Sequence, residues 1–209
     1  MLDAVPDGAR VLDVGCATGY LAAELTRRGC RVTGVEAEPL AAERARAHCE
    51  ALVVGDVEDD ACRGELAALA APAPFDVVLC GDVLEHLRDP WSALAAVGAL
   101  AAPGGTVVLS VPNVAHWTAR RALARGRFPY AEHGLFDRTH LRFFTRASAR
   151  DLAESAGLRV VRERFAPAPI PIQARLPALR ALERVAVRVR PELFALQVVL
   201  VCAASGSRR

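Results

Sequence analysis

Three side chains with acid–base and metal-binding chemistry lie close together in the sequence, at Asp82, Glu85 and His86. If the chain makes a helical turn there, the spacing i, i+3, i+4 places all three on one face. His86 could then act as a general base that accepts the proton of a substrate hydroxyl. The three side chains could instead hold a divalent cation that lowers the pKa of the hydroxyl and orients it. In a third, structural interpretation, the two acids cap the loop and His86 packs beneath a ligand.

A glycine-containing turn follows the first apolar run of the chain. The segment Val11-Leu12-Asp13-Val14-Gly15-Cys16-Ala17-Thr18-Gly19-Tyr20 predicts a strand, a tight turn and the start of a helix, where free backbone amides can meet a ligand. A dinucleotide site requires Gly-x-Gly-x-x-Gly at this place. Here Gly15 and Gly19 are separated by three residues, Ala17 replaces the middle glycine, and Asp13 would repel a pyrophosphate. The turn therefore predicts a different ligand, unless it is a plain strand-to-helix turn.

The same turn resembles the first motif of class I S-adenosylmethionine-dependent methyltransferases, Asp-x-Gly-x-Gly-x-Gly. The resemblance continues at Glu36, at Gly55-Asp56-Val57, along Leu79–Leu84 and at Pro103-Gly104-Gly105, and covers roughly residues 10–165. It implies that S-adenosylmethionine is the cofactor, that Glu36 accepts the ribose hydroxyls and that Asp56 binds the adenine amine. The cofactor-binding residues that it implies are Asp13, Gly15, Cys16, Ala17, Gly19, Tyr20, Glu36, Ala37, Gly55, Asp56, Val57, Cys80, Gly81 and Asp82.

The segment from Asp82 to His86 resembles the Glu-x-x-Glu-His metal motif of ubiquinone-pathway O-methyltransferases and of small-RNA 3′-terminal 2′-O-methyltransferases, with Asp82 in place of the first Glu. In the RNA enzymes a further His comes from a later segment that resembles 140–145. The resemblance implies Mg²⁺ or Mn²⁺ held by Asp82, Glu85, His86 and His140. If no metal binds, His86 remains the expected catalytic residue.

Residues 113–144 are predicted to form an insertion on the substrate side. The segments 112–116 and 134–145 resemble small bacterial methyltransferases of sugar, glycan and lipopolysaccharide pathways. Seven arginines lie between positions 120 and 146, and guanidinium groups bind phosphates well, so a phosphorylated nucleotide sugar or lipid-linked glycan is the expected acceptor. The candidate substrate residues are His116, Tyr130, His133, Arg138 and Arg142. The alternative is an ordinary arginine-rich lid, with structural roles for His116 and His133.

Short β-branched runs alternate with alanine-rich runs, which predicts βαβ units and a parallel sheet. We expect strands at Arg10–Val14, Arg31–Val35, Leu52–Val54, Phe75–Cys80, Thr106–Val111, Leu158–Arg164 and Phe194–Cys202. Helices are expected at Tyr20–Arg28, Pro39–Glu50, Glu65–Ala71, Pro90–Ala101, Ser148–Ala156 and Leu176–Val189. The resulting class is α/β: one Rossmann-like domain over 1–209, with a seven-stranded mostly parallel sheet and helices on both faces. The family resemblance implies an antiparallel last strand, and 166–190 is expected to be a proline-rich linker and an amphipathic helix.

The charge of the chain is unevenly distributed. Residues 1–112 contain 8 arginines and 17 acidic residues, a net of −9, whereas residues 113–209 contain 18 arginines and 7 acidic residues, a net of +11. The basic half indicates either an anionic partner, including a membrane surface beside 166–190, or a solvated arginine-rich face. Six scattered cysteines without a CxxC pair indicate buried thiols in a reducing, cytoplasmic compartment, and no transmembrane segment is expected.

Three functions are compatible with these features. The favoured one is transfer of a methyl group to a hydroxyl of a sugar, nucleotide sugar or glycan, with His86 removing the proton. The second is a metal-assisted RNA 2′-O-methyltransferase, which the absence of long basic modules disfavours. The third is a cofactor-binding module without catalysis of its own, which acts beside a partner protein.

Overall fold

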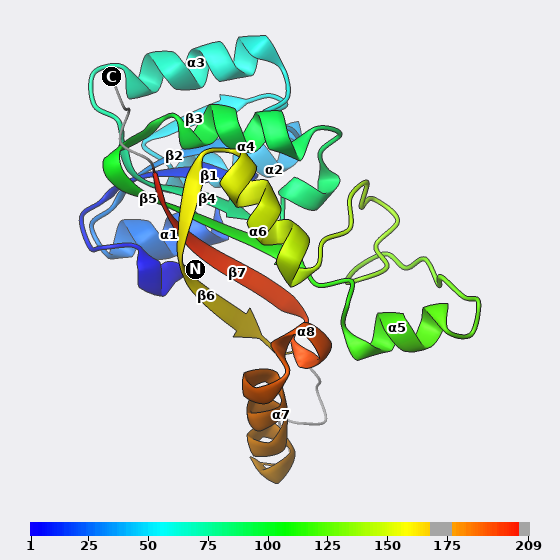
Figure 1. Ribbon diagram of the computed structural model, residues 1–209. Helices are drawn as coiled ribbons and strands as arrows, with labels where there is room; N and C mark the ends of the chain where they lie inside the picture. The colour runs from blue at the N-terminus through cyan, green and yellow to red at the C-terminus, as the bar shows by residue number, and fades with distance from the viewer. Residues whose placement is uncertain (168–176, 205–209) are drawn as a thin grey trace.

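A computed structural model describes residues 1–167 and 177–204 of the chain (Figure 1). The strands are β1 (Arg10–Val14), β2 (Arg31–Glu36), β3 (Ala51–Val54), β4 (Phe75–Gly81), β5 (Ala101–Pro112), β6 (Leu158–Ala166) and β7 (Gln197–Ala204). The helices are α1 (Tyr20–Arg27), α2 (Pro39–Ala45), α3 (Asp60–Ala70), α4 (Pro90–Gly98), α5 (Trp117–Leu123), α6 (Arg146–Ser155), α7 (Pro177–Val189) and α8 (Pro191–Phe194). Three short 3₁₀ turns are η1 (Leu2–Ala4), η2 (Arg46–His48) and η3 (Leu84–His86).

The seven strands form one sheet in the order β3-β2-β1-β4-β5-β7-β6. Strands β1 to β5 pair in parallel, and β7 runs antiparallel to both of its neighbours, β5 and β6. The predicted Rossmann-like, mostly parallel sheet with an antiparallel last strand is therefore confirmed. The strand order reverses between β1 and β4, which is where ligands bind in open sheets of this kind.

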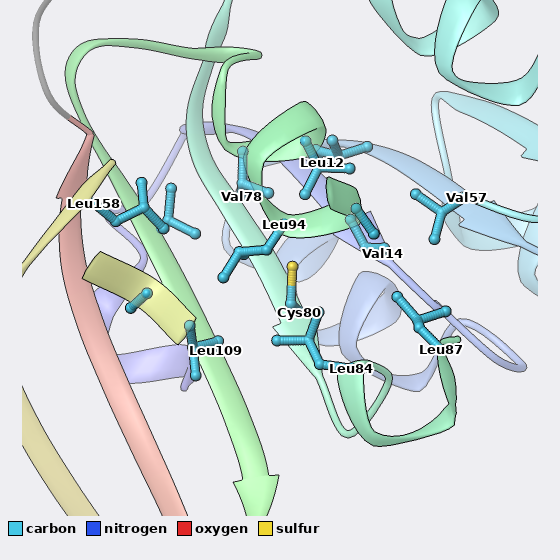
Figure 2. Packing of buried hydrophobic residues seen from close by; sticks show 14 of the residues in the cluster. Leu12, Val14, Val57, Val78, Cys80, Leu84, Leu87, Leu94, Leu109 and Leu158 are labelled. Carbon is cyan, nitrogen blue, oxygen red and sulfur yellow. The ribbon is translucent and has the colours of Figure 1, made fainter. Parts of the chain in front are cut away.

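Side chains alternate between the two faces of the sheet, as the pleat requires. In β4, Val77 and Leu79 pack in a cluster with helix α1, whereas Val78 and Cys80 pack in a larger cluster with α3, α4 and α6. Figure 2 shows part of the larger cluster, with Leu94 of α4 among the strand residues. Both faces are thus covered, which explains why the central strands have nearly continuous apolar sequences.

The turn η3 is held in place by the core. Leu84 and Leu87, on either side of the polar pair Glu85 and His86, are 1% and 8% exposed and belong to the larger cluster. Figure 2 shows Leu84 close to Cys80 of β4. The position of His86 at the end of β4 therefore depends on ordinary hydrophobic burial.

Several element boundaries differ from the predictions. Helix α3 begins at Asp60, five residues earlier than expected, and an acidic residue in the first turn favours that start. The predicted turn Pro103-Gly104-Gly105 lies inside β5, where the pairing with β4 shifts between Phe75 and Val77. The segment 113–144 contains helix α5, which the sequence did not predict. The proline-rich stretch 168–176 lies outside the described residues.

The segment 113–144 lies beyond the carboxyl end of β5, and its two ends meet at its base (Figure 1). Asn113 forms an isolated bridge with Phe144, and the Val114 amide donates to the Phe144 carbonyl at 2.8 Å. Further along, the amides of Leu141 and Arg142 donate to the Glu85 carbonyl at 2.8 and 3.0 Å. The insertion is thereby joined to η3. None of the helices in the described ranges is both long and apolar enough to cross a membrane.

Candidate active site

A cavity of about 360 Å³ opens at the carboxyl ends of β1 to β4. Eight of the fourteen predicted cofactor residues line it: Gly15, Ala17, Glu36, Ala37, Gly55, Asp56, Val57 and Asp82. His86 lines it as well. Sequence reasoning missed four further lining residues, each a direct neighbour of a predicted position: Val35, Glu58, Val83 and Leu87. The predicted motifs therefore converge on a single site.

The other six predicted cofactor residues do not line the cavity: Asp13, Cys16, Gly19, Tyr20, Cys80 and Gly81. Cys80 is fully buried in the core, and the Cys16 sulfur faces Gly34, where an added Cβ would lie 2.8 Å from it. Gly19 lies beneath helix α2, because a Cβ there would be 2.8 Å from the Ala45 Cα. Cys16 and Gly19 therefore shape the turn from below, whereas Tyr20, at the start of α1, is 63% exposed.

Glu36 ties the glycine turn to the end of β2. One carboxylate oxygen accepts the Ala17 amide at 2.8 Å, and the other accepts the Glu38 amide at 2.9 Å. Because these bonds leave further lone pairs free, the carboxylate can still accept from a ligand. Its position at the cavity wall fits the predicted role of holding ribose hydroxyls.

Asp13 is a buried acid without a counter-charge. Its side chain is 2% exposed, and one carboxyl oxygen has no hydrogen-bond partner among the described residues. Burial and the nearby negative charge of Glu36 raise its pKa to about 7. A cationic group bound nearby would supply the missing partner, so this site fits a ligand with an ammonium or sulfonium group.

Two non-glycine residues that line the cavity have left-handed backbone conformations. Ala17 has φ of 49° and Asp82 has φ of 52°. Such conformations cost of order 1 kcal/mol or more and collect at functional sites. The sequence holds a signal for both positions, since Ala17 stands where the related motif has its middle glycine, and Asp is one of the residue types enriched in this conformation.

The structure corrects the expected position of Asp82. A 3₁₀ turn covers only Leu84–His86, and the left-handed backbone of Asp82 directs its carboxylate elsewhere. That carboxylate accepts from the Ser110 hydroxyl at 2.7 Å and from the Gln197 amide at 2.7 and 2.8 Å. Asp82 is therefore not grouped with Glu85, His86 and His140 as a metal ligand.

The remaining three predicted ligands do come together. Glu85, His86 and His140 each place one ligand atom within 4.8 Å of the others. The Glu85 side chain is 1% exposed, one of its carboxyl oxygens lacks a partner in the described chain, and burial raises its pKa to about 8. The imidazoles of His86 and His140 meet edge-to-face with their centroids 4.8 Å apart. A carboxyl and two imidazoles in this arrangement could hold a divalent cation.

A row of aromatic side chains in the insertion, here called the aromatic ladder, extends from these imidazoles through Phe143 and Phe128. His140 lies 6.3 Å from Phe143, which lies 5.4 Å from Phe128, all centroid to centroid. Phe128 also contacts Tyr130 and Phe136 edge-to-face, at 5.0 and 5.1 Å. Phe143 and Tyr130 remain 42% and 70% exposed, so this predicted substrate side can offer apolar ring faces to a ligand.

The other predicted substrate residues have mixed outcomes. His116 is 4% exposed, and its Nδ1 lies 2.7 Å from the Thr118 hydroxyl at the start of α5, where it caps the helix, which favours the alternative of a structural role. His133 is exposed at the surface of the insertion.

Five of the seven arginines between 120 and 146 bond within the chain. Arg120 reaches the Ala115 carbonyl, Arg125 the Arg121 carbonyl, Arg138 the Glu132 carboxylate, Arg142 the Arg88 carbonyl, and Arg146 the Glu163 and Glu192 carboxylates. They are thus less available to a phosphate than the sequence indicated.

Comparison with known proteins places the chain in a family. The family model described as a methyltransferase domain matches residues 1–163. The chain belongs to this family. The expected class I S-adenosylmethionine-dependent methyltransferase is thereby confirmed.

Individual relatives extend the comparison. A ubiquinone biosynthesis O-methyltransferase of Neisseria meningitidis serogroup A is 41% identical over 107 residues, which are 51% of this chain and 45% of that protein. One from Aeromonas salmonicida is 33% identical over 157 residues, 73% of this chain and 64% of the relative. The chain thus spans about half to two thirds of the length of these relatives. A solved S-adenosylmethionine-dependent methyltransferase of Archaeoglobus fulgidus has the same fold, with a TM-score of 0.68, 17% identity, and coverage of 97% of this chain and 89% of the other.

The buried carboxyl of Asp13 predicts an unusual pH dependence of stability. Its pKa of about 7 in the folded chain lies above the ordinary 3.8, so the folded state holds more protons between about pH 4 and pH 7, and stability falls as the pH rises through that window. Asp13→Asn removes this pH-dependent loss of stability, because an amide does not ionise. We expect the stability of Asp13→Asn relative to the parent chain to rise between pH 5 and pH 8, by up to a few kcal/mol at about 1.4 kcal/mol per pKa unit. Melting temperatures of the two chains across this pH range measure the change.

Glu36→Gln is the matched control, because the Glu36 carboxylate is already bonded to two backbone amides. Because the charge of Glu36 adds to the raised pKa of Asp13, the relative melting temperature of Glu36→Gln should rise over the same pH range by less than that of Asp13→Asn. An equal pH response in the two variants would show that Asp13 is not the source of the instability.

Proposed function

We propose that the chain is an S-adenosylmethionine-dependent O-methyltransferase that binds its cofactor in the cavity at the ends of β1 to β4 and uses His86 as the general base. The observation that carries this proposal is that His86 lines the same cavity as Gly15, Glu36 and Asp56, the residues of the cofactor motifs. The buried acid Asp13, which has an unpartnered carboxyl oxygen, precedes the turn at this cavity by two residues. The cavity volume of about 360 Å³ lies within the range of small-molecule sites.

The residues at the site fit the cofactor. Asp13 supplies negative charge for the cationic end, Glu36 can accept ribose hydroxyls, and Asp56 at the end of β3 can accept the adenine amine. When bound, S-adenosylmethionine supplies an electrophilic methyl group on a sulfonium. The chain itself contributes a base and fixed positions, which reduce the entropic part of the barrier.

In the proposed reaction His86 accepts the proton of the acceptor hydroxyl as the oxygen forms its bond to the methyl carbon and the carbon–sulfur bond breaks. The products are a methyl ether and S-adenosylhomocysteine, with the proton on the imidazole. His86 is suited to this step because it lines the cavity wall and meets the insertion that faces the acceptor. General-base catalysis of this kind contributes about 10²- to 10⁴-fold.

The acceptor is proposed to be a small molecule whose hydroxyl sits on a ring. The aromatic ladder favours a ring face beside His140 and Phe143, and the relatives named as ubiquinone biosynthesis O-methyltransferases favour oxygen as the methylated atom. A sugar or glycan remains the prediction from the insertion sequence, since sugars also stack on aromatic rings. The engaged arginines weaken the case for a phosphate group and for RNA.

Substitution of His86 tests the proposal. A screen of phenolic and sugar hydroxyl acceptors should yield S-adenosylhomocysteine together with a methylated product. In His86→Asn we expect kcat to fall by about 10²- to 10⁴-fold while cofactor affinity is retained, because the base is lost and the cofactor walls are not. His48→Asn, a change at an exposed histidine of η2, should leave kcat unchanged. Unaltered turnover in His86→Asn would remove this residue from the mechanism.

A metal-assisted reaction is the second candidate, and the grouping of Glu85, His86 and His140 favours it. A divalent cation there would pair the buried Glu85 carboxylate and lower the pKa of an acceptor hydroxyl.

Calorimetry with Mn²⁺ tests the ligand set. We expect Glu85→Gln to abolish the binding heat and Asp82→Asn to retain it, because Asp82 is bonded to Ser110 and Gln197 instead. No heat in the parent chain would exclude the metal candidate and leave general-base catalysis. Loss of binding in both variants would restore Asp82 to the ligand set.

A further inference from the structure

His86 meets the insertion through one residue, Thr139. The His86 Nδ1 lies 3.1 Å from the Thr139 hydroxyl oxygen and 3.3 Å from the Thr139 carbonyl oxygen. Fifty-three residues separate the two side chains in the sequence, and the amide bonds from Leu141 and Arg142 to the Glu85 carbonyl hold them together. Whether His86 donates or accepts here decides which of its nitrogens can take a proton.

The direction of the Thr139 hydroxyl is set by Asp137. One Asp137 carboxylate oxygen accepts the Thr139 hydroxyl at 2.6 Å and the Thr139 amide at 2.8 Å. These bonds hold the pKa of Asp137 below its ordinary value, with help from the nearby imidazoles of His140 and His86. Because this carboxylate oxygen accepts both the amide and the hydroxyl of Thr139, the single hydroxyl hydrogen of Thr139 points to Asp137.

Two acceptors consequently face the His86 Nδ1. The Thr139 carbonyl can only accept, and the Thr139 hydroxyl has given its hydrogen to Asp137. If Thr139 donated to His86 instead, two oxygens 2.6 Å apart, on Thr139 and Asp137, would face each other without a hydrogen between them. A neutral imidazole carries one proton, so that proton belongs on Nδ1 and Nε2 keeps its lone pair.

We propose that Asp137 and Thr139 are positioning residues that hold His86 as the Nδ1-protonated tautomer, so that Nε2 is the atom that takes the acceptor proton. Neither residue is among those expected to act at this site. The tautomer follows from the contacts above, whereas its use in catalysis rests on the proposed function.

The other ionisable groups around His86 do not compete for Nδ1 through any described hydrogen bond. His140 meets the ring edge-to-face, and Glu85 and Asp82 have their carboxyl groups on η3 and at the end of β4. The same tautomer would serve a metal ligand, because a ligating imidazole commonly donates its other N–H to a carbonyl oxygen.

The tautomer can be measured directly in the full chain without cofactor or acceptor. In protein labelled with ¹⁵N-histidine, long-range ¹H–¹⁵N correlation spectra of the neutral imidazole distinguish a protonated from an unprotonated ring nitrogen. We expect the His86 Nδ1 to be protonated and Nε2 unprotonated, with the signals assigned by their loss in His86→Asn. A His86 ring with the proton on Nε2 would overturn the proposal.

Variants of the two positioning residues supply the controls. Thr139→Val keeps the shape but removes the hydroxyl, and should shift His86 toward a mixture of tautomers, whereas Thr139→Ser should restore the parent spectrum. Asp137→Ala should have the same effect as Thr139→Val, since it removes the acceptor that orients the hydroxyl. Thr118→Val removes the hydroxyl beside His116, a matched pair elsewhere in the chain, and should leave the His86 signals unchanged. A parent-like His86 spectrum in both Thr139→Val and Asp137→Ala would contradict the assigned roles.

The catalytic part of the proposal is tested separately, with any acceptor that the parent chain methylates. Thr139→Val should lower kcat by about tenfold, which is part of the contribution of a general base, and leave KM for the cofactor unchanged. Thr139→Ser should recover kcat to within about twofold. If the tautomer is confirmed but no acceptor is methylated, the proposed function fails and the arrangement of His86 stands. If methylation occurs and kcat does not change in Thr139→Val, the positioning role in catalysis is wrong.

Discussion

The active site depends on a pair of backbone hydrogen bonds. The Glu85 carbonyl accepts the amides of Leu141 and Arg142, and this joins the turn at the end of β4 to an insertion more than fifty residues later. Leu84 and Leu87 hold one side of the junction in the core, and the bridge between Asn113 and Phe144 closes the other. Through these contacts the imidazole of His86 lies between a cofactor-sized cavity and an aromatic surface.

The site is assembled at a cost in stability. Asp13 and Glu85 are buried acids with unpaired oxygens, and Ala17 and Asp82 adopt backbone conformations that L-residues avoid. A neutral side chain would remove the cost of each buried acid, and a glycine would remove the cost of each left-handed residue. The costly residues are tolerated because the rest of the sheet and its two apolar layers stabilise the fold. The same features suit a ligand with positive charge at one end and a hydroxyl substrate at the other.

Much of this arrangement could be predicted from the sequence, because strand order, turn glycines and the acids at strand ends follow periodic and local rules. Eight predicted cofactor residues line the cavity, and Glu85, His86 and His140 meet as expected. The roles that could not be predicted share one cause, which is that they depend on contacts between residues far apart in the sequence. Asp82 was grouped with its sequence neighbours, whereas Ser110 and Gln197, from two other strands, bind its carboxylate. Likewise, Thr139 and Asp137 acquire significance only where the insertion meets η3.

The central claim is that the cavity at the ends of β1 to β4 binds S-adenosylmethionine, and calorimetric titration of the full chain with this cofactor and with S-adenosylhomocysteine tests it most directly. We expect one cofactor per chain. A bound cation favours the ionised form of Asp13, whose pKa is about 7. The affinity for S-adenosylmethionine should therefore weaken by up to tenfold for each pH unit below that value. Asp13→Asn should abolish this pH dependence and lower the affinity at pH 7.5. Absence of binding to either ligand, or binding that ignores both pH and Asp13→Asn, would contradict the account.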